Sequence, residues 1–117
     1  MQRYMEDGVT LTDETPGLVA RLGGDISIRN AANLHRILLE AWKQDGTGRA
    51  LTVDLGNAKH IDSSGLGALL ELVSDGVPLT LCNLQASPRR LLERTGLSNL
   101  FRIAVDCADM PVSLGTT

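Results

Sequence analysis

Aromatic residues are scarce in this chain of 117 residues, which contains one tryptophan, one tyrosine and one phenylalanine. The hydrophobic core must therefore be built mainly from aliphatic side chains. Proteins that bind single-stranded nucleic acids commonly stack the bases on aromatic rings. The scarcity of such rings argues against that mode of binding.

The chain also has fewer basic than acidic residues. Eleven lysine and arginine residues stand against fourteen aspartate and glutamate residues, which gives a net charge of −3 at neutral pH. A mildly acidic chain without a basic block is poorly suited to bind a phosphate backbone or an anionic membrane surface. We therefore expect no nucleic-acid partner.

Long apolar runs are missing as well. No segment approaches the ~18 consecutive apolar residues of a membrane span, and the first residues lack the apolar core of a secretory signal. These absences predict a cytoplasmic protein that does not insert into a membrane. The two cysteines, Cys82 and Cys107, lie far apart without metal-ligand spacing. We interpret both as reduced thiols and expect no metal site.

Hydrophobic periodicity divides the chain into short elements. Alternating apolar residues predict strands, and apolar residues at helical spacing predict helices. Ser27 or a neighbouring polar residue is expected to cap the first helix, Ser87 to cap the third, and Gly96 to end the third. The expected strands lie at 9–12, 18–22, 51–55, 77–83 and 100–105, and the expected helices at about 28–44, 66–75 and 88–95.

The order of these elements indicates the fold class. Strands that alternate with single helices require crossover connections, and crossovers produce a mostly parallel sheet. We expect a single α/β domain over residues 1–117, with a core at about 9–105. Its mixed, mostly parallel sheet should have four to five strands with three to four helices. Residues 1–8 and 106–117 carry little apolar pattern, so they are expected to be poorly ordered or peripheral.

The segment Asp62-Ser63-Ser64-Gly65-Leu66-Gly67 joins the carboxyl end of a strand to a helix start, where open α/β sheets place their ligand sites. A phosphoryl group on a serine here would lie beside the free N–H groups at the positive end of the helix dipole. It would add about −1.5 to −2 units of charge without unfolding the domain. The pattern therefore suits a phosphorylation switch. The same residues could also form a plain helix cap or a weak anion site.

This segment, following the strand Leu51-Thr52-Val53-Asp54-Leu55, resembles the phosphorylation-site signature of STAS domains, and more specifically that of bacterial anti-sigma-factor antagonists. The resemblance extends over residues 9–105. It implies that Ser63 accepts phosphate from a serine kinase that is also an anti-sigma factor. The partner-binding residues that it implies are Asp62, Ser63, Ser64, Gly65 and Ser27.

The resemblance also implies how the switch works. The unphosphorylated antagonist binds the kinase and frees a sigma factor, phosphorylation ends that binding, and a phosphatase restores it. The chain itself would catalyse nothing and need no cofactor.

Two departures from the family are visible. Ser27 stands where many antagonists carry an acidic residue, and residues 106–117 lack the periodicity of the usual terminal helix. A short or missing helix would bare part of the sheet and favour a homodimer.

Several alternatives stay open. A STAS domain can be an unphosphorylated docking subunit of a membrane transport complex, or a module of another signalling pathway. Gly65-Leu66-Gly67 at a helix start could bind a nucleotide, although the full glycine-rich fingerprint is missing. His60 lies near Ser63 in sequence without the pattern of a hydrolase, so we expect a solvated loop residue. We expect His35 at the border of the first helix's apolar face.

Overall fold

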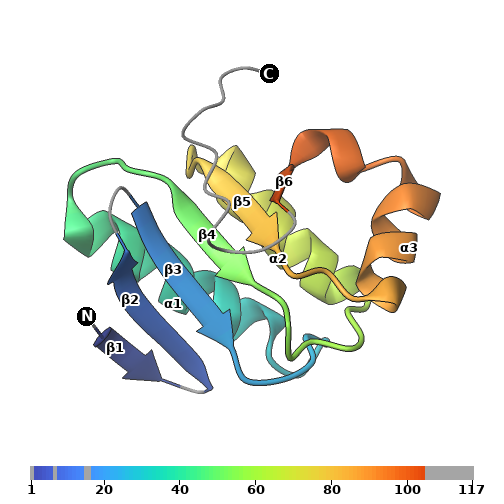
Figure 1. Ribbon diagram of the computed structural model, residues 1–117, viewed down its shortest axis with the longest axis horizontal. Coiled ribbons are helices and arrows are strands. Elements are labelled where there is room, and N and C mark those ends of the chain that lie inside the picture. Colours follow the sequence, from blue (N-terminus) through green and yellow to red (C-terminus); the bar gives the residue numbers. More distant parts are fainter. Residues whose placement is uncertain (1, 7, 15–16, 105–117) are drawn as a thin grey trace.

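The computed structural model describes residues 2–6, 8–14 and 17–104. Within them, a six-stranded sheet has its strands in chain order from β1 to β6 (Figure 1). The helices are α1 (Ala31–Asp45), α2 (Ser63–Ser74) and α3 (Ala86–Thr95), with a short 3₁₀ turn, η1 (Ser98–Leu100). The strands are β1 (Gln2–Glu6), β2 (Val9–Glu14), β3 (Gly17–Leu22), β4 (Leu51–Asp54), β5 (Leu79–Cys82) and β6 (Arg102–Ala104).

Among the described strands, β2 alone runs opposite to the other five. The pairs β1–β2 and β2–β3 are antiparallel, whereas β3–β4, β4–β5 and β5–β6 are parallel. The three helices are the crossovers that parallel pairing requires. The predicted α/β class with a mixed, mostly parallel sheet is confirmed. The described sheet exceeds the expected four to five strands, because Gln2–Glu6 pairs with β2 at the sheet edge. An edge strand pairs through backbone groups on one side, so it needs no apolar alternation.

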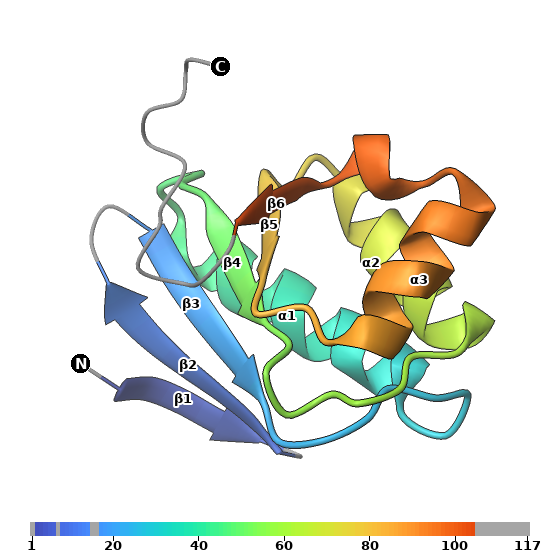
Figure 2. The ribbon, with the colours of Figure 1, turned by 45° about the vertical axis from the view of Figure 1, so that its right-hand side comes forward.

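The core lies between the sheet and the two helices α1 and α2, which run side by side over one face (Figure 2). It is aliphatic, as the shortage of aromatic residues predicts. Trp42 is only partly buried, and its indole N–H donates to the carbonyl oxygen of Arg49 at 2.8 Å. The largest fully buried side chains are Leu11, Leu18, Ile37, Leu38, Leu51, Leu55, Leu69, Leu72 and Leu81.

Several helix boundaries differ from those expected. Helix α1 begins after Asn30 rather than at residue 28, and the main-chain oxygen of Ser27 accepts from the N–H groups of Asn30 and Ala31. Ser27 therefore forms the turn ahead of the helix, and the N-cap position is held by the neighbouring polar residue Asn30, whose side chain makes no capping hydrogen bond. Helix α3 begins after Gln85, so Ser87 is not its cap. Gly96 ends α3 with a φ of 74°, as predicted.

The expectation about the thiols is wrong for Cys82, which is buried in β5 and disulfide-bonded. Spacing along a sequence does not reveal whether two thiols come close enough in space to bond, so the pattern could not predict this disulfide. Cys107 lies outside the described residues, as do residues 106–117, on which the expectation of a short or missing terminal helix rests.

Candidate functional site

The candidate phosphorylation site lies at the start of α2. Ser63 is the first residue of the helix and is exposed, whereas Ser64 is partly buried. Within the described part of the chain, no hydrogen bond engages the Ser63 hydroxyl. The first turn of α2 contains no acidic residue. A group attached to Ser63 would therefore meet solvent and the positive end of the helix dipole.

Asp62 is the residue that caps α2. Its backbone is extended, and its Oδ1 accepts a hydrogen bond from the N–H of Gly65 at 2.9 Å. Its Oδ2 accepts a second bond from the N–H of Ile28 at 3.0 Å. The sequence indicated that this segment could cap a helix but not which of its residues does so. Because Asp62 takes this role, the hydroxyl of Ser63 is left out of the cap.

Gly65 allows the first turn of α2 to approach the loop that precedes α1. A Cβ atom at Gly65 would lie 2.7 Å from Cγ2 of Ile26 and 2.9 Å from both Cβ of Ile26 and Cγ2 of Ile61. Real Cβ atoms do not come so close to other carbons. Gly65 is buried, so it lies beneath the surface that Asp62, Ser63 and Ser64 form rather than in it.

Two loops that are distant in sequence meet at this end of α2. Ile26 and Ile61 form an isolated parallel bridge, in which the N–H of Ile26 donates to His60 O and the N–H of Asp62 donates to Ile26 O, each at 3.2 Å. Asp25 adds further bonds, since its Oδ1 accepts from the N–H groups of Lys59 at 2.8 Å and His60 at 3.1 Å. The bridge places the turn that contains Ser27 next to the segment at the start of α2.

Sequence reasoning does not single out Asp25 and Ile28. The signal that could have found Asp25 is an acidic residue between a glycine pair and an apolar residue, just after a buried strand. Ile28 carries no such signal. Its side chain is 76% exposed, which is unusual for an isoleucine.

A shallow groove runs between α1 and α2 beside Ser63. Most of the residues that line it are small, and Ile28 is the large apolar residue among them. Glu71 is the charged residue in its lining. The lining residues are Ile28, Ala31, Ala32, Ser64, Gly67, Ala68 and Glu71.

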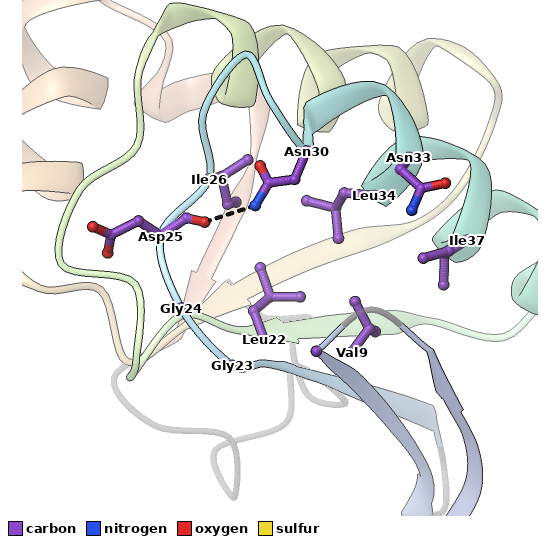
Figure 3. Close-up of a pocket in the computed structure, with 11 residues that line it drawn as sticks. Val9, Leu22, Gly23, Gly24, Asp25, Ile26, Asn30, Asn33, Leu34 and Ile37 are labelled. Atoms are coloured by element: carbon purple, nitrogen blue, oxygen red, sulfur yellow. Dashed lines mark hydrogen bonds between the residues drawn. The ribbon is translucent and has the colours of Figure 1, made fainter.

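A cavity of about 100 Å³ lies between the β3–α1 loop and α1 (Figure 3). Leu22, Leu34 and Ile37 line it with apolar surface. Both polar atoms of the Asn30 side chain are hydrogen-bonded within the protein. Nδ2 donates to Asp25 O at 3.0 Å, and Oδ1 accepts from the N–H of Ser27 at 2.9 Å. The cavity therefore offers little polar chemistry to a ligand.

Neither His35 nor His60 is hydrogen-bonded to Ser63 in the described residues. His60 is exposed in the loop before α2, as expected. His35 is partly buried, with Nε2 2.9 Å from Oδ2 of Asp75 just after α2. No group of side chains in 2–6, 8–14 and 17–104 could hold a metal ion. A search of the same residues found no helix long and apolar enough to cross a bilayer.

Comparison with known proteins agrees with this description. The sequence model of the STAS domain family matches residues 9–110. Similar solved structures include a Thermotoga maritima protein assigned as a candidate anti-sigma factor antagonist, which is 18% identical over 84% of this chain and 86% of its own, with a TM-score of 0.74.

Two further structures share the fold. An anti-sigma factor antagonist from Mycobacterium paratuberculosis is 22% identical over 86% of this chain and 87% of its own, with a TM-score of 0.73. The phosphorylated form of the Bacillus cell fate determinant SpoIIAA is 22% identical over 83% of this chain and 91% of its own, with a TM-score of 0.58. The resemblance noted in the sequence is confirmed, and the chain belongs to the STAS domain family.

Proposed function

We propose that this STAS domain is an anti-sigma factor antagonist, which binds an anti-sigma factor with serine kinase activity and is switched off by phosphorylation of Ser63. The observation that carries the proposal is the exposed position of Ser63 at the start of α2, beside a cap that Asp62 provides. The structural neighbours described as anti-sigma factor antagonists, one of them in a phosphorylated form, support it.

Electrostatics at the helix start explain how such a switch would work. A phosphoryl group on Ser63 would lie at the positive end of α2, which favours the charge and leaves the fold intact. It would also turn a neutral hydroxyl into a group of about −1.5 to −2 charges beside the Asp62 carboxylate. A partner surface that fits the hydroxyl would then meet both added bulk and added negative charge.

The position of the two serines favours Ser63 as the acceptor. Ser64 is partly buried and faces the groove between α1 and α2, so a kinase would reach its hydroxyl less easily. In this proposal the kinase supplies ATP and magnesium, and the chain supplies the acceptor hydroxyl and a docking surface. A phosphatase removes the phosphate and returns the chain to the binding form.

Mass spectrometry tests the assignment directly. The purified chain is incubated with lysate of its native host and ATP–magnesium, and the digest is fragmented finely enough to separate Ser63 from Ser64. We expect one phosphoryl group, on Ser63, because its hydroxyl is exposed and outside the cap.

The matched controls are Ser63→Ala, which should abolish the modification, and Ser64→Ala, which should leave it in place. Phosphate on Ser64 alone would refute the assignment. A chain that stays unmodified with lysates from several growth conditions would refute the switch and favour an unphosphorylated docking subunit.

A further inference from the structure

Two carboxylates hold the loops around Ser63 together, one from each loop. Asp25 precedes α1 and accepts from two N–H groups of the opposite loop, those of Lys59 and His60. Asp62 precedes α2 and accepts from the N–H of Ile28 in the first loop. Each loop thus binds the backbone of the other, and the partner-facing end of the domain is one unit rather than two independent loops.

The two carboxylates differ in how many oxygens they use. Both bonds to Asp25 reach the same atom, Oδ1. Asp62 divides its bonds, because Oδ1 caps Gly65 while Oδ2 holds Ile28. An asparagine keeps one accepting oxygen but replaces the other with a donor. It can therefore replace Asp25 in this network but cannot replace Asp62.

Asp62 holds the backbone N–H of Ile28, whose side chain lies exposed to solvent. Its side chain is 76% exposed and borders the groove that Ser64 also lines. Contiguous exposed apolar surface marks protein contacts, and Ile28 extends the apolar lining that Ala31, Ala32 and Ala68 give this groove. The backbone of Ile28 is fixed by the residue that immediately precedes Ser63.

We propose that Asp62 is a positioning residue that holds Ile28 in place beside Ser63, and that Ile28 is an apolar contact for the anti-sigma factor kinase. This inference rests on the proposed function and deepens it by naming how the docking surface is arranged. Without the bond to Asp62, the turn that contains Ile28 would have to be ordered when the partner binds, and affinity would fall.

The test compares Asp62→Asn with Asp25→Asn. Each substitution removes one negative charge from the same end of the domain, so the pair is matched in charge. Asparagine is as good a helix cap as aspartate, so Asp62→Asn should still cap Gly65. It should lose only the bond to Ile28.

The first readout needs no partner. We expect amide hydrogen exchange at Ile28 to become about tenfold faster in Asp62→Asn, the equivalent of one lost charge-assisted hydrogen bond. Exchange at Gly65 should stay slow, and Asp25→Asn should change neither rate. Unchanged protection of Ile28 in Asp62→Asn would overturn the proposed role of Asp62.

The second readout uses the chain as substrate of the kinase activity in native-host lysate with ATP–magnesium. Asp62→Asn and Ile28→Ala should each raise KM by about fivefold at nearly unchanged kcat, since both weaken docking rather than chemistry. The double variant should be no worse than the weaker-binding single variant, because Asp62 acts through Ile28. Additive effects, or a fall in kcat alone, would contradict the inference.

The two readouts separate this inference from the proposed function. If the wild-type chain is never phosphorylated, the proposed function fails and Ile28 loses its assigned partner. If phosphorylation occurs normally but Ile28→Ala leaves KM unchanged, the proposed function stands and the role of Ile28 is refuted.

Discussion

Replacing Gly65 with alanine should lower the free energy of unfolding by about 2 kcal/mol, the range in which an overpacked core site falls. For a domain of this size the loss corresponds to a fall in the thermal midpoint of about 8 °C. The matched replacement, Gly67→Ala, should raise the stability by up to about 1 kcal/mol, because alanine is the better helix former. Both glycines lie in α2, two positions apart.

The surroundings of the two glycines explain the opposite signs. A Cβ at Gly65 would come within 3 Å of carbons in both Ile26 and Ile61, whereas a Cβ at Gly67 has nothing within 4 Å. One of the atoms in the way is Cβ of Ile26, which is not the movable end of a side chain. Ile26 is also buried and paired with Ile61 through the backbone bridge. The first turn of α2 must therefore move away from the loop.

Thermal unfolding followed by circular dichroism measures both changes. Comparison with Gly67→Ala removes the general effect of placing alanine in this helix. If the two variants shift the midpoint by the same amount and in the same direction, close packing at Gly65 does not hold α2 against the loop, and the account of the site would be wrong.

Local patterns in the sequence were sufficient to find the helix that carries the site. The order of Asp62, two serines and two glycines before an apolar stripe marks a capped helix start, and such signals involve neighbouring residues. The ends of α1 and α3 at Gly46 and Gly96 follow for the same reason, since a left-handed residue ends a helix locally.

The arrangement of the two loops could not be predicted in this way. The bond from Ile28 to Asp62 spans 34 positions, and the bonds from Lys59 and His60 to Asp25 span 34 and 35. Such contacts depend on β3 and β4 being parallel neighbours, which brings the ends of both strands to the same edge of the sheet. The sequence predicts a parallel sheet but not which polar side chain meets which backbone group.

Errors in the choice of caps have a related cause. Serine is a favourable cap in general, yet α1 and α3 begin after Asn30 and Gln85. Gln85 is held by the loop between β4 and α2, where its side-chain amide donates to Gly56 O. Contacts made by the loops therefore decided these boundaries against the local preference.

Ser63→Asp should weaken binding to the anti-sigma factor kinase by at least about tenfold, since burying an unpaired negative charge in an interface costs more than about 1.4 kcal/mol. Ser63→Ala should retain nearly full affinity, because it removes a hydroxyl that no other group in the described residues binds. The phosphorylated chain should bind more weakly than Ser63→Asp, since phosphate carries about −1.5 to −2 charges against one for aspartate. Isothermal titration with the kinase fractionated from the host lysate measures all four affinities.

Ser74→Asp is the matched control, because Ser74 is exposed at the opposite end of α2 and receives the same added charge. It should leave the affinity unchanged. The helix dipole also gives the two variants opposite effects on stability. A carboxylate at Ser63 stabilises the helix start by about 0.3–1 kcal/mol, whereas one at Ser74 destabilises the helix end by a similar amount.

The variant that loses binding is thus the one expected to fold slightly better, so lost affinity in Ser63→Asp cannot be attributed to unfolding. Equal loss of affinity in both variants would mean that total charge, not the position of Ser63, governs the interaction. Unchanged affinity in Ser63→Asp would place the partner's contact away from the start of α2.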